Sequence, residues 1–334
     1  MRHANVALFV THYGCPHMCS FCDQNAITGV TARLTRENVD SAVCTALDSG
    51  KTDPKSSEIA FFGGSFTAID TDYMKSLLEW AYVYVSRGLF KGIRISTRPD
   101  YIDNNILDIL KSYGVTAVEL GAQSMDDTVL FLNERGHTAD DVRHAAGLIS
   151  AQGFELGLQM MTGLYGSSEE KDIFTANELI SLCPATVRIY PTVVLKGTRL
   201  CELFLEKKYN PPGVDETVDL CAKLLKMFND ENISVIRLGL HSGGDVEENF
   251  VAGAYHPALR ELVESKIYLN KFENYFKENP GVAFAVINVA KGEASKATGH
   301  GGVNKRTLEA LGMKIKIHER ESLSPGEFFI DTIR

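Results

Sequence analysis

The stretch VALFVTHYGCPHMCSFC (residues 6–22) joins an apolar run, typical of a buried strand, to three cysteines spaced C-x3-C-x2-C. The cysteines are Cys15, Cys19 and Cys22. Three thiolates can bind three irons of a cubane and leave the fourth iron with an open coordination position. The pattern therefore predicts a [4Fe-4S] centre in the loop after the first strand.

Zinc is the alternative metal for this loop. A structural zinc site needs four ligands, usually from paired C-x2-C units, and the sequence has no second pair. His12 or His17 could supply a fourth ligand, so zinc stays open as the weaker interpretation. The separate cysteines Cys183, Cys201 and Cys221 are interpreted as buried thiols and not as a second cluster.

Outside this loop, short β-rich runs alternate with longer segments of helical pattern. This alternation predicts βαβ units, a parallel sheet and right-handed crossovers. Six units are too few for a closed eight-stranded barrel, so an open partial barrel or a doubly wound sheet is expected. The strand-like runs are 6–10, 58–64, 92–97, 117–124, 154–161 and 186–194. The helical segments are 34–49, 70–88, 103–113, 126–151 and 168–182.

Composition limits the class of protein. The chain has 334 residues and a formal charge of -9, so any site for a polyanion must be a local basic patch. No run approaches the ~20 apolar residues of a membrane span, and the N-terminus lacks the apolar core of a signal peptide. These features predict a cytoplasmic protein without a membrane partner. Three cysteines within eight positions fit metal binding in a reducing compartment.

Polar and glycine positions follow several of the predicted strands. They include Gly63 and Gly64 after the second strand, Ser96 and Arg98 around the end of the third, and Gln123 at the end of the fourth. In parallel α/β sheets the working site lies at the carboxyl ends of the strands. These residues and the cysteine loop are therefore expected to meet at one edge.

The C-x3-C-x2-C loop after a first strand, with an aromatic residue before its last cysteine, resembles the radical S-adenosylmethionine (radical SAM) superfamily. The resemblance implies a partial (β/α)6 TIM-like barrel with a small α+β C-terminal region. It also implies that the open iron binds S-adenosylmethionine and that its reductive cleavage yields a deoxyadenosyl radical. The chemistry belongs to the cofactor, and the protein orients it.

The same resemblance implies roles for residues near the strand ends. Gly63 and Gly64 are expected to hold the methionyl amine, and Arg98 or Arg135 to pair with the carboxylate through a guanidinium fork. Phe21 is expected to pack over the adenine. The implied cofactor-binding residues are Phe21, Gly63, Gly64, Ser96, Arg98, Gln123, Arg135, Gln159 and Met160.

Downstream segments are similar to one branch of that superfamily. RIYPTVVLKGTRLCELFLEKKYNPP (188–212), GAQS with NERGHT, and YHPALRELVES (255–265) resemble the catalytic subunit of the elongator complex, particularly short bacterial members of the group. That subunit modifies wobble uridine in transfer RNA. The chain stops at 334, so an acetyltransferase domain is not expected. The resemblance implies a core at 1–195, an extension at 196–270 and a basic region at 271–334.

Residues 291–316 invert the charge balance, with six Lys/Arg against two Glu. Their order of helix, glycine loop, helix and strand is similar to a KH module, in which a G-x-x-G loop clamps nucleotide backbone. A solvated basic helix hairpin is the structural alternative. The expected substrate contacts are Gly299, His300, Gly301, Gly302, Lys305 and Arg306.

The sequence therefore predicts a radical SAM enzyme that modifies an RNA base, with transfer RNA as partner and flavodoxin or ferredoxin as reductant. Two alternatives stay open: radical SAM chemistry on a small molecule such as a tetrapyrrole, and a non-catalytic iron–sulfur protein that binds RNA.

Overall fold

The structure is a computed structural model that describes residues 5–10, 19–22, 32–50, 53–240 and 246–333. No helix in these ranges is both long enough and apolar enough to cross a membrane.

The chain divides into two compact units. Unit 1 comprises Met1–Gly213 and Phe228–Tyr255, and unit 2 comprises Val214–Met227 and His256–Arg334. The segment 196–270, expected to be one extension, is thus shared between the two units.

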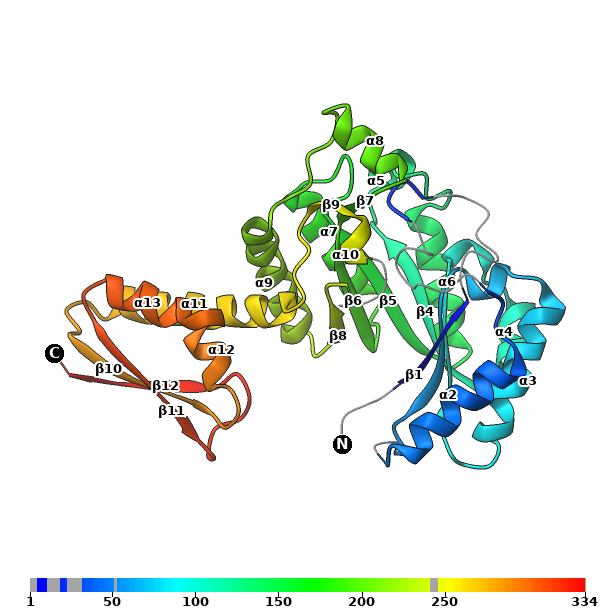
Figure 1. The fold of residues 1–334 in the computed structure, drawn as a ribbon, viewed down its shortest axis with the longest axis horizontal. Coiled ribbons are helices and arrows are strands. Elements are labelled where there is room, and N and C mark those ends of the chain that lie inside the picture. Colours follow the sequence, from blue (N-terminus) through cyan, green and yellow to red (C-terminus); the bar gives the residue numbers. More distant parts are fainter. Residues whose placement is uncertain (1–4, 11–18, 23–31, 51–52, 241–245, 334) are drawn as a thin grey trace. The chain divides into compact units, whose positions relative to one another are not determined.

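Unit 1 is built around a curved sheet of seven parallel strands in the order β1-β2-β3-β4-β5-β6-β8 (Figure 1). The partial-barrel α/β class is confirmed, and it has one strand more than the six expected. The extra strand forms from the apolar run 233–240, which pairs beside β6. The strands are β1 (Asn5–Val10), β2 (Glu58–Gly63), β3 (Gly92–Thr97), β4 (Val115–Gln123), β5 (Glu155–Thr162), β6 (Thr186–Pro191) and β8 (Ser234–Leu238).

The strands have two different faces because successive side chains alternate across a sheet. On β3, Ile93 and Ile95 are fully buried, and they share a face with the apolar residues that pack beneath the helices. Arg94 and Ser96 point the other way, into the concave side of the sheet. This alternation lets an apolar core and a polar interior share the same six-residue strand.

The crossover helices begin where the sequence supplies side-chain caps. A Ser, Thr or Asp oxygen at each start accepts a backbone N–H of the first turn, which satisfies a donor that the helix leaves unpaired. The caps are Thr35, Asp70, Asp103, Asp126, Thr138 and Ser168. The helices are α2 (Arg36–Asp48), α3 (Thr71–Val85), α4 (Asn104–Ser112), α5 (Asp127–Leu132), α6 (Ala139–Ala151) and α7 (Glu169–Ser181).

Shorter elements complete unit 1. The expected strand 186–194 divides at Thr192, and β7 (Val193–Leu195) pairs antiparallel with β9 (Phe250–Gly253). The remaining helices are α8 (Arg199–Leu205), α10 (Val246–Asn249) and α9 (Val214–Asp230), whose residues are divided between the units.

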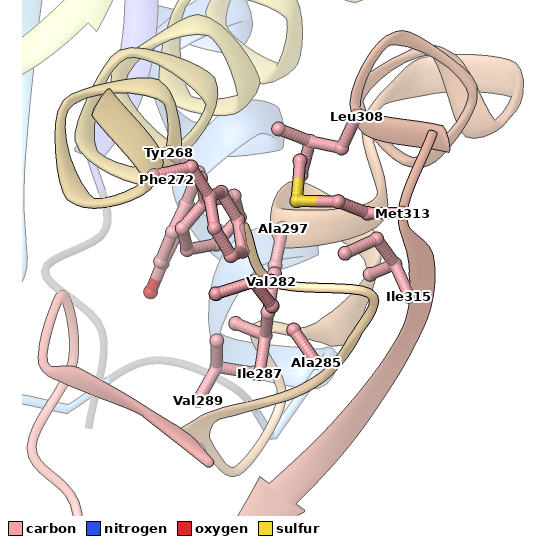
Figure 2. Close-up of a cluster of buried hydrophobic side chains, with 11 residues drawn as sticks. Tyr268, Phe272, Val282, Ala285, Ile287, Val289, Ala297, Leu308, Met313 and Ile315 are labelled. Carbon is pink, nitrogen blue, oxygen red and sulfur yellow. The ribbon is translucent and has the colours of Figure 1, made fainter. Parts of the chain in front are cut away.

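Unit 2 packs helices on one face of a three-stranded sheet. β10 (Phe284–Ala290) lies in the centre, parallel to β11 (Lys314–Arg320) and antiparallel to β12 (Phe328–Ile333). Tyr268 and Phe272 pack against inward side chains of the sheet to form this core (Figure 2). The helices are α11 (Leu259–Glu278), α12 (Ala294–Thr298) and α13 (Val303–Ala310).

Candidate functional site

The loop between α5 and α6 changes the expected layout of the site. The sequence predicted a helical segment over 126–151, and within it α5 ends at Leu132 and α6 begins at Ala139. Thr138 caps α6 through a capping box with Asp141. The intervening loop, 133–138, carries NERGHT to the carboxyl edge of the sheet.

This loop holds the described part of the cysteine segment. The Ser20 backbone N–H donates to the carbonyl of Asn133 at 3.1 Å, and the Ser20 hydroxyl donates to the Asn133 side-chain oxygen at 3.0 Å. The Leu200 N–H donates to the Ser20 carbonyl at 2.7 Å. A turn bond of 3.0 Å from the Cys22 N–H to the Cys19 carbonyl fixes the last two cysteines relative to each other. The segment 11–18, with Cys15, His12 and His17, lies outside the described residues.

Arg135 contacts the cysteine segment directly. Its Nη1 donates to Cys19 Sγ at 3.0 Å and its Nη2 to the Gly121 carbonyl at 2.7 Å. The Arg135 side chain is buried, and its Nε has no hydrogen-bond partner within the described residues. The contact to Cys19 joins residues 116 positions apart, so spacing alone could not predict it.

Arg98 was the other candidate for a carboxylate partner, and its guanidinium is occupied differently. Its Nε and Nη2 form a bidentate pair with Asp100, both at 2.9 Å, and Nη2 also donates to the Arg135 carbonyl. The two predicted arginines do meet. Arg98 fixes the backbone that carries Arg135, while Arg135 faces the cysteine.

The end of β4 has a bulge that positions Gln123. Its register with β5 shifts between Gly121 and Gln123, and Gln123 adopts a φ of 65°. Gln159 Nε2 donates to Gln123 Oε1 at 3.3 Å, so these two predicted residues lie together. A Cβ at Gly121 would lie 2.9 Å from the side-chain nitrogen of Gln123, so a larger residue here would displace that side chain. Met160 lies on the opposite face of β5, fully buried with Leu158, and therefore packs in the core under the helices.

His137 supports the same bulge. Its Nε2 lies 3.2 Å from the Ala122 carbonyl, so this nitrogen carries the proton and donates. Its Nδ1 is buried without a hydrogen-bond partner in the described ranges. Burial, followed by the nearby charges of Arg135 and Arg98, lowers the pKa of His137 to about 3. The imidazole is therefore neutral at physiological pH.

This lowered pKa predicts a loss of stability in acid. The unfolded chain protonates His137 near pH 6.5 while the folded chain does so only near pH 3, so stability falls as pH drops between these values. At pH 5 the loss is about 2 kcal/mol relative to pH 7. The test follows unfolding in urea by Trp80 fluorescence at pH 7 and at pH 5. We expect the urea midpoint to fall less between these two pH values in His137→Gln, whose side chain can still donate to a carbonyl, than in the unaltered protein. The exposed His144→Gln variant is the control, and an unchanged difference in His137→Gln would contradict the prediction.

The glycines after β2 bring the ends of β1 and β2 together. The Gly64 N–H donates to the Val10 carbonyl at 2.7 Å, and Gly63 has a φ of 107°. A Cβ on Gly63 would lie 3.1 Å from the Val10 oxygen. Ser65 turns inward and hydrogen-bonds Thr97.

The two remaining predicted residues near this edge differ in their surroundings. Ser96 lies on the concave face of β3, opposite Glu119 in the register. Phe21 packs against an apolar cluster that contains Leu200, Cys201 and Tyr209. Its ring therefore packs against α8. In the chain, Phe21 lies between Cys19 and Cys22.

A buried ion cluster that the sequence did not predict lies below this edge, on the concave side of the sheet. Arg94 contacts Glu58 at 2.7 Å and Glu119 at 3.2 Å, and it also pairs with Glu155. Arg188 contacts Glu119 at 2.7 Å. Burial alone would lower the pKa of Arg94, but its carboxylate partners outweigh burial and raise that pKa. Charged residues that recur on the same face of neighbouring strands are the signal that could have revealed the cluster.

The predicted substrate residues lie in unit 2. Gly299, His300, Gly301 and Gly302 connect α12 to α13, as expected, and Gly299 and Gly302 have φ values of 83° and 81°. The cations of this loop contact groups in their own segment. Lys305 lies 3.8 Å from Glu309, and Arg306 Nη1 donates to the Gly301 carbonyl at 2.6 Å.

The residues at the edge of unit 1 fit an anionic cofactor of the expected kind. Cys19 offers a buried sulfur that already accepts a guanidinium N–H. Within the described residues, the Arg135 Nε is a buried donor that lacks an acceptor. Buried polar groups are almost always hydrogen-bonded, so a buried donor next to a cysteine indicates a site built for a further negative group.

A curved sheet of seven parallel strands joined by crossover helices defines an α/β partial barrel. The Radical SAM superfamily model matches residues 9–177, and the Radical_SAM C-terminal domain model matches 184–268. The chain belongs to the radical SAM superfamily.

Curated relatives narrow the similarity. The chain is 32% identical over 174 residues to a tRNA uridine(34) acetyltransferase of Dehalococcoides mccartyi, covering 46% of this chain and 38% of the relative. It is 30% identical over 190 residues to human Elongator complex protein 3, covering 51% of this chain and 35% of the relative. The matched part is therefore little more than a third of these relatives' length.

The fold agrees with a solved member of this group. The archaeal Methanocaldococcus infernus Elp3 with an N-terminal deletion superposes with a TM-score of 0.62 at 20% sequence identity. The match covers 83% of this chain and 63% of that chain. At this identity the likeness supports the fold alone.

Proposed function

We propose that Cys15, Cys19 and Cys22 bind a [4Fe-4S] cluster with an open iron for S-adenosylmethionine, and that the enzyme modifies a uridine of transfer RNA. Such a cluster supplies a deoxyadenosyl radical when the bound cofactor is cleaved reductively. A flavodoxin or ferredoxin supplies the electron. The contact between Arg135 and Cys19 carries the site proposal, and the relatives named for tRNA uridine modification support the substrate.

The residues of this chain have separate parts in the proposed mechanism. Asn133 and Leu200 hold the cysteine segment on the barrel through Ser20. Arg135 donates to Cys19 and keeps Nε for an anionic group of the cofactor. Gln123, set by its bulge and Gln159, presents an amide at the same edge. Binding and orientation are thus assigned to this chain, and radical formation to the cofactor.

The proposed function is tested by an anaerobic assay. Protein loaded with iron and sulfide, S-adenosylmethionine and dithionite should release deoxyadenosine. Total transfer RNA added to the same reaction should gain a modified uridine, which nucleoside mass spectrometry detects. If deoxyadenosine forms but the RNA is unchanged, transfer RNA is not the substrate. If iron-loaded protein forms no deoxyadenosine, the proposed radical SAM activity is rejected.

The hydrogen bond to Cys19 predicts an effect of Arg135 on the cluster's reduction potential. Hydrogen bonds to the sulfurs raise the potential of an iron–sulfur cluster, because they stabilise the more negative reduced form, and those from a charged donor are the strongest. We expect Arg135→Leu to keep its iron content but to have a more negative midpoint potential in an EPR-monitored titration, with Arg135→Lys in between.

Arg143→Leu is the matched control, because Arg143 lies half-exposed on α6 and pairs with Glu178. Its midpoint potential should equal that of the unaltered protein. An Arg135→Leu protein with full iron content, an unchanged potential and an unchanged EPR signal would refute the contact.

A further inference from the structure

One face of the unit 2 sheet is left without helices. Ala285, Ile287 and Val289 of β10 point into the core beneath α11, α12 and α13. Because side chains alternate along a strand, Phe284 and Val286 point to the opposite face. The order β11-β10-β12 then places one flanking strand on each side of them.

β11 carries a row of basic side chains on this open face. Lys314, Lys316, His318 and Arg320 occupy alternate positions and are all exposed. The intervening Ile315 is buried in the core. Residues two apart on a strand lie roughly 7 Å from each other, so the four side chains form a regular line.

Asp331 of β12 is an acid on this face, and its carboxylate accepts the Asn288 side-chain N–H at 3.0 Å. Within the described residues neither Lys314 nor Lys316 forms an ion pair, and Lys316 Nζ lies 5.7 Å from the Phe284 ring centroid. Arg320 Nε donates to Asn288 Oδ1 at 2.8 Å. Glu319, the acid within the row, points to the other face, where its carboxylate accepts the Ala294 N–H.

The cations of the glycine loop differ from this row. Lys296 lies 3.1 Å from both Glu264 and Glu293, and Lys305 pairs with Glu309. Ion pairing reduces the charge that these residues offer to a ligand. Arg306 donates to the Gly301 carbonyl and forms no ion pair within the described residues, so the loop keeps one such cation, whereas β11 presents several basic side chains in a row.

An exposed aromatic ring completes the face. Phe329 on β12 is 43% exposed and lies opposite Asn288 in the register. Asn288 in turn neighbours His318 on β11. A ring beside a line of cations is the combination that binds single-stranded nucleic acid, with bases stacked on the ring and phosphates on the cations.

We infer that this open face, defined by Lys314, Lys316, His318, Arg320 and Phe329, binds a single-stranded stretch of the RNA substrate. The inference rests on the proposed function. A chain with a net charge of -9 attracts a polyanion only through such a local patch. An acidic protein would match the cations but gives no role to the exposed ring, so RNA fits the face better.

The test measures binding of fluorescently labelled total transfer RNA to the full chain, without S-adenosylmethionine, at several salt concentrations. Lys314→Gln combined with Lys316→Gln should weaken binding roughly tenfold and reduce the slope of log K against log salt by about 1.4, since each contact to a single strand contributes about 0.7. Phe329→Ala should weaken binding several-fold and leave the salt slope unchanged, because stacking releases no counterions.

Lys291→Gln combined with Lys266→Gln is the control. It removes the same charge from the same unit, but both residues are ion-paired, with Glu321 and Asp219. Its affinity and slope should stay close to those of the unaltered protein. If this control and the Lys314/Lys316 variant lose the same affinity, the loss reflects the total charge of the unit, and the proposed face is rejected.

The outcomes separate this inference from the proposed function. If the unaltered protein binds RNA and the Lys314/Lys316 variant binds it equally well, the face is rejected and the RNA substrate stands. If Gly301→Asp loses RNA binding while the Lys314/Lys316 and Phe329 variants keep it, the face is also rejected and the glycine loop is the binding site. If the unaltered protein binds no RNA, both the face and the RNA substrate are rejected, while deoxyadenosine release still tests the radical chemistry.

Discussion

A Cys19→Ala variant is expected to lose its iron–sulfur cluster and all cleavage of S-adenosylmethionine, and Cys15→Ala and Cys22→Ala should behave in the same way. With three protein ligands and one open iron, the cluster has no spare thiolate to replace a missing one. Cys19 also accepts the Arg135 N–H, so its removal leaves a buried guanidinium without that acceptor. The readouts are iron and sulfide content, visible absorption and deoxyadenosine.

Cys201→Ala is the matched control for this prediction. Cys201 is also buried and packs in the apolar cluster that contacts Phe21, but the proposed site does not use its sulfur. It should retain iron and activity. Full iron content in Cys19→Ala would disprove the ligand assignment. If the protein holds only zinc after oxygen-free purification and loading with iron and sulfide, the site is a zinc site and not an iron–sulfur cluster.

A Glu119→Gln variant should destabilise unit 1 by about 3–5 kcal/mol, because the buried Arg94 and the largely buried Arg188 lose the carboxylate that they share. Glu119 bonds Arg94 Nη1 at 3.2 Å and Arg188 Nε and Nη2 at 2.7 and 3.1 Å. Removing one partner of a buried ion pair costs far more than the pair's net contribution, since the remaining charges stay desolvated.

Trp80 allows this effect to be measured on unit 1 alone. It is the single tryptophan of the chain and lies on α3 in unit 1, so its fluorescence in urea follows that unit. Glu178→Gln is the control, because its partner Arg143 is half-exposed and such pairs contribute about 0–1 kcal/mol. If Glu119→Gln unfolds at as high a urea concentration as Glu178→Gln, the ion cluster does not stabilise the barrel.

The places of several candidate site residues at strand ends could be predicted because they follow from local patterns. Gly63, Gly64 and Gln123 come where strand runs end, and parallel strands bring those ends to one edge. The role of Arg98 could not be read in this way. Arg98 and Arg135 are equally plausible as free guanidinium forks in the sequence, and only the folded chain shows that Asp100 occupies one of them.

Other differences arise where a local signal has two meanings. The segment 126–151 has helical composition throughout, but Thr138 and Asp141 form a capping box that starts a second helix. Met160 and Gln159 are adjacent on β5, and the alternation of the strand sends one to the core and the other to Gln123. The basic segment 291–316 predicted charge at the glycine loop, whereas ion pairs with Glu264, Glu293 and Glu309 leave the strand as the more open cationic surface.

The sequence by itself determined the order of strands and helices, the parallel sheet and the cysteine spacing, because apolar periodicity, capping residues and turn residues act over a few positions. The tertiary structure alone decided that Arg135 reaches Cys19, that Glu119 joins Arg94 to Arg188, and that one sheet face of unit 2 stays open. These contacts join residues that are far apart in the chain, and they depend on strand register and sheet curvature. The register of a strand depends on which of its faces is buried against the neighbouring strands and helices. The strand's own sequence therefore does not identify the residues that pair with it.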